Sequence, residues 1–231
     1  MLKFKRGDKM NTCYIACALD ARLDFEPDKT DLVIGADRGC QVLLDQGKRI
    51  DLAVGDFDSG DVPLNTKVIK YPVKKDETDG AIAIKHAIEK GYNKIRMYGA
   101  IGGLLDHTIA IISTMCLYAE KGIEIALIDG DNVVFAIHNG TVHFSSEASG
   151  RISVFSHNDK SIGVYEKGLL YTLDNYTLDN KTSLGSGNSF IGKEAEISVE
   201  NGTLLIYTSK NNFDNYLTKE EQSDKIITSH N

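Results

Sequence analysis

The sequence lacks any long apolar run and contains only four cysteines and three prolines among its 231 residues. A transmembrane helix needs roughly 20 consecutive apolar residues, and no segment approaches that length. The cysteines lack the C-x-x-C spacing of a zinc site and are too few for a disulfide-built scaffold. They indicate buried free thiols in a reducing compartment, so we expect a cytoplasmic protein. The cysteines are Cys13, Cys17, Cys40 and Cys116.

Two phosphate-binding patterns are absent as well. Neither G-x-x-x-x-G-K-[ST] nor G-x-G-x-x-G occurs, so any bound phosphate is held without a P-loop or a dinucleotide fingerprint. The net charge of −7 argues against a broad electrostatic footprint for nucleic acid or an anionic membrane, although a local basic patch is compatible with it. With 42% hydrophobic and 26% charged residues, the composition is that of a globular protein with a substantial core.

Short β-rich runs alternate with helical patterns from residue 12 to about residue 137. In the helical pattern at 79–90, Ala81, Ile84 and Ile88 share one face. Such alternation predicts an α/β domain at residues 12–143, with a layered, mostly parallel sheet and helices. The candidate strands are 13–19, 31–36, 51–55, 66–71, 94–100, 124–129 and 132–137, and the candidate helices are 39–45, 79–90 and 106–121.

The pattern changes after about residue 140 to short β segments punctuated by glycine. Segments 151–156, 161–166, 195–200 and 203–209 are typical of antiparallel strands, and Asn201-Gly202 is a hairpin signal. We therefore predict a smaller all-β, sandwich-like domain at 150–210, followed by a tail at 211–231. The tandem pentamer YTLDNYTLDN at 171–180 has too few copies to indicate a solenoid.

The segment GDFDS places Asp56 and Asp58 directly after an apolar strand. Ligand crevices of open α/β sheets lie at the carboxyl ends of strands. Because alternate residues of an extended chain face the same side, both carboxylates can reach one hard cation while Phe57 turns towards the core. An ordinary turn is the alternative, since Asp, Ser and Gly are common turn formers.

Carboxylates recur at other junctions that follow strands. For Asp76 and Asp79, which begin the second helix, capping of that helix is the alternative. Capping explains poorly why carboxylates recur after several strands. Clustered carboxylates with a Gly-Gly backbone and nearby cations are typical of a site for Mg²⁺ and polyphosphate. The recurring acidic positions are Asp37, Asp76 with Asp79, and Asp106 with His107; the cations are Arg38, Lys70, Lys74 and Lys75.

The ordered motifs GADRG, GDFDS, KKDETD and GAIGGLLDH resemble the catalytic domain of the thiamine pyrophosphokinase family, bacterial type. The later segments GLLYTLDNYTL, SLGSGNSF and GTLLIY resemble the thiamine-binding domain of that family. The resemblance covers about residues 12–209. It implies an ATP-dependent enzyme that transfers a pyrophosphoryl group to the hydroxyl of thiamine and releases AMP, and it implies a homodimer with thiamine between the subunits.

Carried over by motif position, the resemblance assigns roles to individual residues. Asp56, Asp58 and Asp79 would bind magnesium and act in catalysis. Asp106 would be a further catalytic carboxylate. Ser186 and Asn188 would contact thiamine. The expected contacts to ATP and its phosphates are Asp37, Arg38, Lys75, Asp76, Gly102, Gly103 and His107.

Two departures from the family pattern leave alternatives open. Leu104 stands where bacterial members usually carry arginine, and Arg38 follows Asp37 where glycine is usual. Arg38 or a lysine would then supply the missing charge. The alternatives are a non-catalytic thiamine or nucleotide sensor, a pyrophosphokinase for another small alcohol such as a pterin, and a phosphohydrolase.

Overall fold

The structure is a computed structural model that describes residues 11–57, 66–74 and 76–218. Two of the expected site residues, Asp58 and Lys75, lie outside these ranges. The chain divides into two compact units, Met1–Ile111 and Ile112–Asn231. None of the helices in the described ranges has the length and apolar character that crossing a membrane requires.

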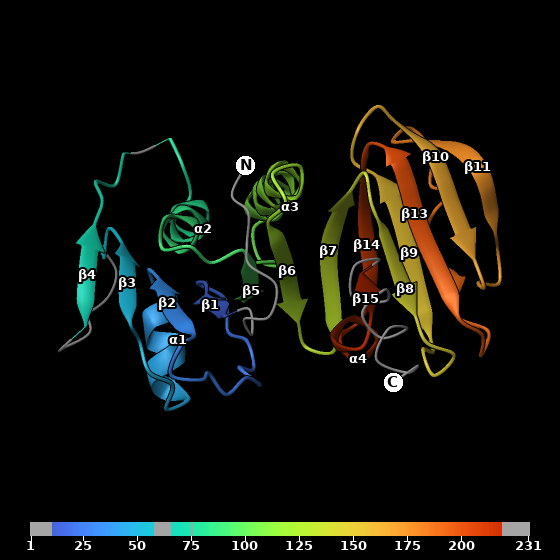
Figure 1. The fold of residues 1–231 in the computed structure, drawn as a ribbon. Coiled ribbons are helices and arrows are strands. Elements are labelled where there is room, and N and C mark those ends of the chain that lie inside the picture. The colour runs from blue at the N-terminus through green and yellow to red at the C-terminus, as the bar shows by residue number, and fades with distance from the viewer. Residues whose placement is uncertain (1–10, 58–65, 75, 219–231) are drawn as a thin grey trace. The chain divides into compact units, whose positions relative to one another are not determined.

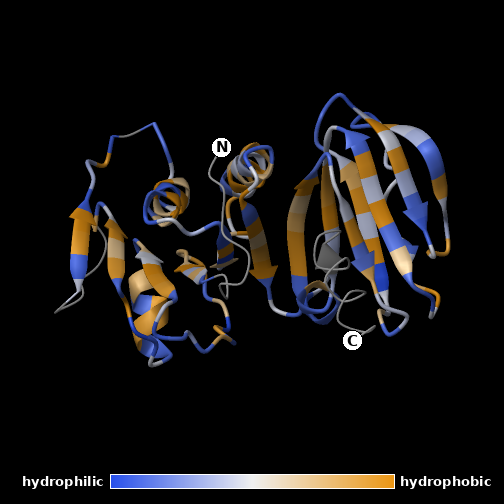
Figure 2. Ribbon diagram, viewed as in Figure 1, coloured by the Kyte–Doolittle hydropathy of each residue, from blue (hydrophilic) through white to orange (hydrophobic). Residues whose placement is uncertain are grey.

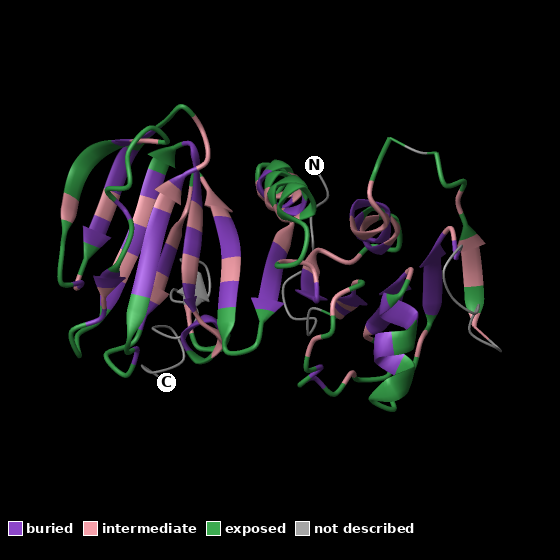
Figure 3. Ribbon diagram, turned by 180° about the vertical axis from the view of Figure 1, so that it is seen from behind, coloured by how far each residue is buried: buried purple, intermediate pink, exposed green. Residues whose placement is uncertain are grey.

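The first unit contains a parallel sheet whose strand order is β5-β1-β2-β3-β4 (Figure 1). All residues of β2 and β3 are buried, which explains their nearly continuous apolar sequence, because a parallel strand covered on both faces needs no polar side. Figure 3 shows this buried centre in purple. The five strands are β1 (Thr12–Ala16), β2 (Leu32–Ala36), β3 (Leu52–Gly55), β4 (Lys67–Lys70) and β5 (Lys94–Tyr98).

The strand order reverses direction between β1 and β5. From β1 the chain moves outwards through β2, β3 and β4, and then returns to place β5 on the other side of β1. Ligands of open α/β sheets bind outside the carboxyl ends of the strands at such a reversal. The helices are α1 (Gly39–Asp45), α2 (Asp79–Glu89) and α3 (Leu105–Ala119), of which α3 continues across the boundary of the two units.

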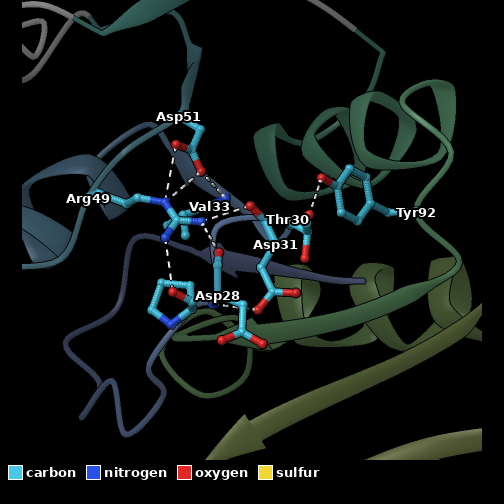
Figure 4. Close-up of polar contacts among 8 residues, drawn as sticks. Asp28, Thr30, Asp31, Val33, Arg49, Asp51 and Tyr92 are labelled. Atoms are coloured by element: carbon cyan, nitrogen blue, oxygen red, sulfur yellow. Dashed lines mark hydrogen bonds and ion pairs between the residues drawn. The ribbon is translucent and has the colours of Figure 1, made fainter. Parts of the chain in front are cut away.

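The loop before β2 is held by one guanidinium group at the amino ends of the strands (Figure 4). Arg49 donates to the backbone oxygens of Pro27, Asp28 and Asp31 at 3.0, 2.7 and 2.8 Å. Its Nε also donates to the Asp51 carboxylate, at 3.2 and 3.3 Å to the two oxygens. Arginine suits this position because its planar fork reaches several acceptors at once.

The second unit is built from antiparallel strands in two sheets. One has the order β6-β7-β14-β9-β12 and the other β11-β10-β13-β8-β15. Buried and partly exposed residues alternate along most of β13, and Figure 2 shows the corresponding alternation of colour. The elements are β6 (Glu124–Asp129), β7 (Asn132–His138), β8 (Thr141–Phe144), β9 (Arg151–Ser156), β10 (Lys160–Lys167), β11 (Leu173–Asp179), β12 (Asn188–Ser189), β13 (Ala195–Asn201), β14 (Thr203–Ser209), α4 (Lys210–Asp214) and β15 (Leu217–Thr218).

The predicted fold class is confirmed: a mostly parallel α/β part precedes an antiparallel β part. The compact units meet at residues 111 and 112, whereas the predicted domains meet between residues 143 and 150. The reason is that β7 pairs with β14 along its whole length, so contacts group β6 and β7 with the later strands. The tandem pentamer forms β11, an edge strand that sequence patterning did not predict because its exposed residues show no alternation.

Candidate active site

A cavity of ≈ 280 Å³ opens at the carboxyl ends of β1, β2 and β5. It coincides with the reversal of strand order. Its walls are mostly small or apolar, with carboxylates and one imidazole among them. The lining residues are Cys17, Ala18, Leu19, Ala36, Asp37, Thr78, Asp79, Gly80, Gly99, Ala100, Gly102, Leu104, His107 and Ile111.

Asp37 reaches this cavity from an unusual backbone turn at the end of β2. Its φ is 50°, in the left-handed region that aspartate tolerates better than most residues. The turn is held by the Asp37 N–H, which donates to the Val54 carbonyl at 2.7 Å. A Cβ at Gly55 would lie 3.0 Å from Asp37 Cα, so glycine at position 55 allows the two turns to approach.

The GDFDS turn follows β3 and is anchored by its aromatic residue. Phe57 is 8% exposed and packs with Cys40 and Ala53, with Ile50 and Val68 beside them. This confirms that Phe57 turns towards the core. Its φ of 51° is rare for a bulky side chain and is held by the burial of the ring. Asp56 thus leaves β3 beside the Asp37 turn, although neither it nor Phe57 lines the cavity.

The amino end of α2 forms another wall. Thr78 is the N-cap residue, and its hydroxyl accepts from the Ala81 N–H at 3.3 Å. Capping is therefore done by Thr78, which leaves Asp79 to line the cavity with a buried Oδ1. Asp76, expected to support the site, is exposed and lies outside the cavity lining.

The amino end of α3 brings Leu104 and His107 to the cavity. The Thr108 hydroxyl lies 3.1 Å from both the N–H and the carbonyl of Gly102 and fixes the preceding loop. Asp106 is exposed, and its carboxylate accepts from the His107 N–H at 2.9 Å. Neither Asp106 nor Gly103 lines the cavity.

Arg38, the expected substitute for the missing arginine, is engaged elsewhere. Its guanidinium donates to Asp20 at 3.1 Å, and both side chains are largely exposed. Arg38 does not line the cavity, whereas Leu104 does and is 65% exposed. Whether Arg38 serves a bound phosphate stays a prediction.

Cys17 is a lining residue that sequence patterning assigned only to the core. Burial raises the pKa of its thiol to about 12, and the Asp79 carboxylate acts in the same direction. In the sequence, only the alternation of side-chain directions at the end of the first strand could have indicated that Cys17 lines the cavity. The thiol is thus a neutral wall of the cavity at neutral pH.

The cavity carboxylates fit a divalent cation whose remaining ligands are phosphate oxygens and waters. Asp37 and Asp79 both line the cavity, and Mg²⁺ is commonly held by one or two carboxylates together with waters and phosphate oxygens. Within residues 11–57, 66–74 and 76–218, no group of three or more His, Cys, Asp or Glu side chains is arranged to hold a metal.

The two residues expected to contact thiamine lie in the second unit and differ in exposure. Ser186 is exposed, whereas Asn188 is 5% exposed. The Asn188 amide makes four hydrogen bonds within the chain, to Tyr171, Ser189 and Glu166. Since an asparagine side chain has two donors and two acceptor positions, a contact from Asn188 to a ligand would replace one of these bonds.

Comparison with known proteins shows what the chain is similar to. Residues 23–127 match the family model described as thiamin pyrophosphokinase, catalytic domain. The chain is 28% identical over 190 residues to a thiamine pyrophosphokinase of Bacillus subtilis, covering 79% of this chain and 89% of that protein.

Solved structures give the same result. A crystal structure of thiamine pyrophosphokinase from Bacillus subtilis has a TM-score of 0.74 at 26% identity and covers 86% of this chain and 99% of that one. The thiamin pyrophosphokinase structure from Geobacillus thermodenitrificans has the same TM-score and identity, with 86% and 97% covered. The family model, the curated relative and the solved structures therefore all support the thiamin pyrophosphokinase family for this chain.

Proposed function

We propose that this protein transfers the pyrophosphoryl group of ATP to the hydroxyl of thiamine, giving thiamine diphosphate and AMP. The observation that carries the proposal is the cavity at the reversal of strand order, which brings Asp37 and Asp79 together with the amino ends of α2 and α3. Helix amino ends favour anions because their free N–H groups and dipoles point at the ligand.

The carboxylates have two proposed tasks, metal binding and proton acceptance, and Asp79 takes part in both. Asp56, Asp58 and Asp79 are the proposed Mg²⁺ ligands, with Asp37 in support, and the metal would neutralise charge on the transferred phosphates. Asp79 lies in the first turn of α2 and lines the cavity, so it is placed to accept the proton of the thiamine hydroxyl. That oxygen bonds to the β-phosphorus of ATP, and the bond from the β-phosphorus to the oxygen bridging to the α-phosphate breaks, leaving AMP.

The apolar part of the cavity limits how the phosphates can lie. Leu104 and Leu19 form a wall without charge. Among the described lining residues, His107 is the one side chain that can carry a positive charge. We propose that His107 and backbone N–H groups of the Gly102 loop meet the phosphates where an arginine is usual. A Leu104→Arg variant tests this: a lower KM for ATP is expected from the added charge.

Thiamine would be bound from the second unit. Ser186 is exposed in the loop that joins β11 to β12 and is available to a ligand. We further propose a homodimer with thiamine between the subunits, supported by the family resemblance, and a cytoplasmic location, supported by the four free thiols.

The dimer has its own test. Asp79→Asn and Ser186→Ala subunits are each expected to be inactive or weak. If each site uses Asp79 from one subunit and Ser186 from the other, mixing the two variants should restore about a quarter of the wild-type activity by forming mixed dimers with one intact site. No recovery on mixing would count against the shared site.

The decisive measurement is AMP release from ATP and Mg²⁺ with and without thiamine. Asp79→Asn should lose the thiamine-dependent signal, by about a hundredfold or more if the carboxylate takes the proton. Asp45→Asn is the matched control, because Asp45 is an exposed aspartate on α1 that bonds to Gln41.

The alternatives give different results in the same assay. AMP formed only with another alcohol would identify a different pyrophosphokinase. Phosphate or pyrophosphate released without an acceptor would identify a hydrolase. Thiamine binding with no AMP would identify a sensor.

A further inference from the structure

Glu166 is a buried carboxylate that the proposed chemistry does not use. It lies on β10 and is 2% exposed. Its Oε2 accepts from Asn188 Nδ2 at 2.9 Å, while Oε1 is buried without a hydrogen-bond partner in the described part of the chain. Burial raises the pKa of Glu166 to about 7, and the bond from Asn188 acts in the opposite direction. A buried carboxylate with one oxygen that makes no hydrogen bond lowers the stability of the fold. Its presence at this position therefore suggests a role other than stability.

The partner of Glu166 joins two separate segments. Asn188 Oδ1 accepts from the N–H groups of Tyr171 and Ser189 at 3.0 and 2.9 Å. Asn188 Nδ2 donates to the Tyr171 carbonyl at 2.7 Å as well as to Glu166. The amide therefore ties the chain after β10 to the end of the loop before β12, and Glu166 accepts the second of the two hydrogen bonds that Nδ2 donates.

The residues of this loop just before Asn188 are held against β9. The Gly185 carbonyl accepts from the Val154 N–H at 2.9 Å, and a Cβ on Gly185 would collide with the Val154 carbonyl. The Gly187 N–H donates to Ser153 Oγ at 3.0 Å. Between these fixed points Ser186 remains exposed, so the loop presents its hydroxyl on a backbone that is held on both sides.

We propose that Glu166 is a positioning residue for substrate binding: it holds the Asn188 amide, which fixes the loop 183–189 and thereby the exposed Ser186. The proposal rests on the proposed function, because the loop matters for turnover only if it meets thiamine. Glu166 itself is too buried to touch substrate. Its effect should fall on substrate binding rather than on the chemical step.

The test uses Glu166→Leu, which removes the acceptor, with Glu196→Gln as matched control. Glu196 is on the neighbouring strand β13 and pairs with Lys167 at the surface. The first measurement is hydrogen exchange of the peptide that spans residues 183–189, which needs no activity. Loss of one charge-assisted bond should speed its exchange about tenfold in Glu166→Leu, with no change in Glu196→Gln.

The second measurement separates positioning from general stability. In Glu166→Leu the KM for thiamine should rise about tenfold, again the factor for one such bond, with kcat little changed. The melting temperature should hold or rise, because replacing a buried carboxylate by an apolar side chain removes its desolvation cost. If Glu166 had a purely structural role, its loss would lower the melting temperature. Faster exchange of the loop with an equal or higher melting temperature would therefore indicate positioning.

Glu166→Gln provides a second variant in case Glu166→Leu does not fold. It keeps a neutral acceptor for Asn188, so exchange of the loop should quicken by about threefold. Wild-type exchange and wild-type KM in both variants would overturn the proposal. Absence of thiamine-dependent AMP from the wild-type protein would instead overturn the proposed function, and the exchange data would still show whether Glu166 holds the loop.

Discussion

Replacing Arg49 by methionine should destabilise the first unit without altering its chemistry. Methionine keeps the apolar stem and removes every donor of the guanidinium. The backbone carbonyls of Pro27, Asp28 and Asp31 then each lose a donor, although the Asp28 carbonyl keeps the Asp31 N–H, and Asp51 loses its cation. The loop before β2 keeps other ties, among them the bond from Tyr92 to the Thr30 carbonyl (Figure 4).

The magnitude follows from the number and exposure of these bonds. A buried hydrogen bond to a charged group contributes about 1.5–3 kcal/mol. The Arg49 and Asp51 side chains are each 36% exposed, so water takes over part of each contact and about 0.5–1 kcal/mol per carbonyl is a better value. With the ion pair included, the free energy of unfolding should fall by about 2–3 kcal/mol, which lowers the melting temperature by roughly 5–10 °C for a chain of this size.

Thermal unfolding followed by circular dichroism measures this change, with Arg22→Met as the matched control. Arg22 is 78% exposed and 3.8 Å from Asp24, so its loss should change stability by about 0.5 kcal/mol or less. Arg49 lies at the amino ends of the strands and the candidate site at their carboxyl ends, so kcat of the folded protein should be unchanged in both. Equal melting temperatures for the two variants would refute the reasoning.

Three further predictions concern the site and the buried acid. Gly55→Ala should lower activity at least tenfold in a steady-state assay. The new Cβ would lie 3.0 Å from Asp37 Cα, and displacing a catalytic turn by a few tenths of an ångström slows the reaction. Gly140→Ala, whose new Cβ would make only ordinary contacts, is the control. The pKa of Glu166 is raised to about 7 from its usual 4.5. The free energy of unfolding should therefore be higher below pH 4.5 and fall by about 3 kcal/mol in total as the pH rises to about 7. Urea unfolding at several pH values measures this change. Cys17, with a pKa of about 12, should react with iodoacetamide at pH 8 roughly a thousandfold more slowly than a free thiol, and Asp79→Asn should speed that reaction.

Each of these has an outcome that contradicts it. Full activity of Gly55→Ala would mean that the Asp37 turn is not needed in its present place. For the acid, the sign is fixed because a carboxyl whose pKa rises on folding binds its proton more tightly in the folded state; an equal pH dependence in wild type and Glu166→Gln would exclude Glu166 as its source. Alkylation of Cys17 at the same rate in wild type and Asp79→Asn would show that the two side chains do not interact.

The sequence by itself determined the order of elements and the identity of the acidic turns. Apolar runs such as Leu32–Ala36 predict buried strands, and the pattern of α2 predicts its start at Asp79, which the structure confirms. These features are local: a helix or strand is specified by side-chain periodicity over a few residues. The ordered motifs then sufficed to indicate the family.

Tertiary structure decided which of those residues share a site. Asp37 and Asp79 line one cavity, whereas Asp76 and Asp106 are not among its lining residues, although all four follow strands in the sequence. Local patterns cannot distinguish them, because the distinction depends on strand order, on the approach that Gly55 permits and on Thr78 serving as the cap.

The second unit gives the same lesson more sharply. Nothing local marks Glu166 as buried, since β10 alternates imperfectly and a charged residue usually predicts exposure. Its role emerges only when β10, the chain at Tyr171 and the loop at Asn188 come together. Sequence specified which chemical groups were present, and packing of distant segments decided which were buried, which formed hydrogen bonds and which lined the cavity.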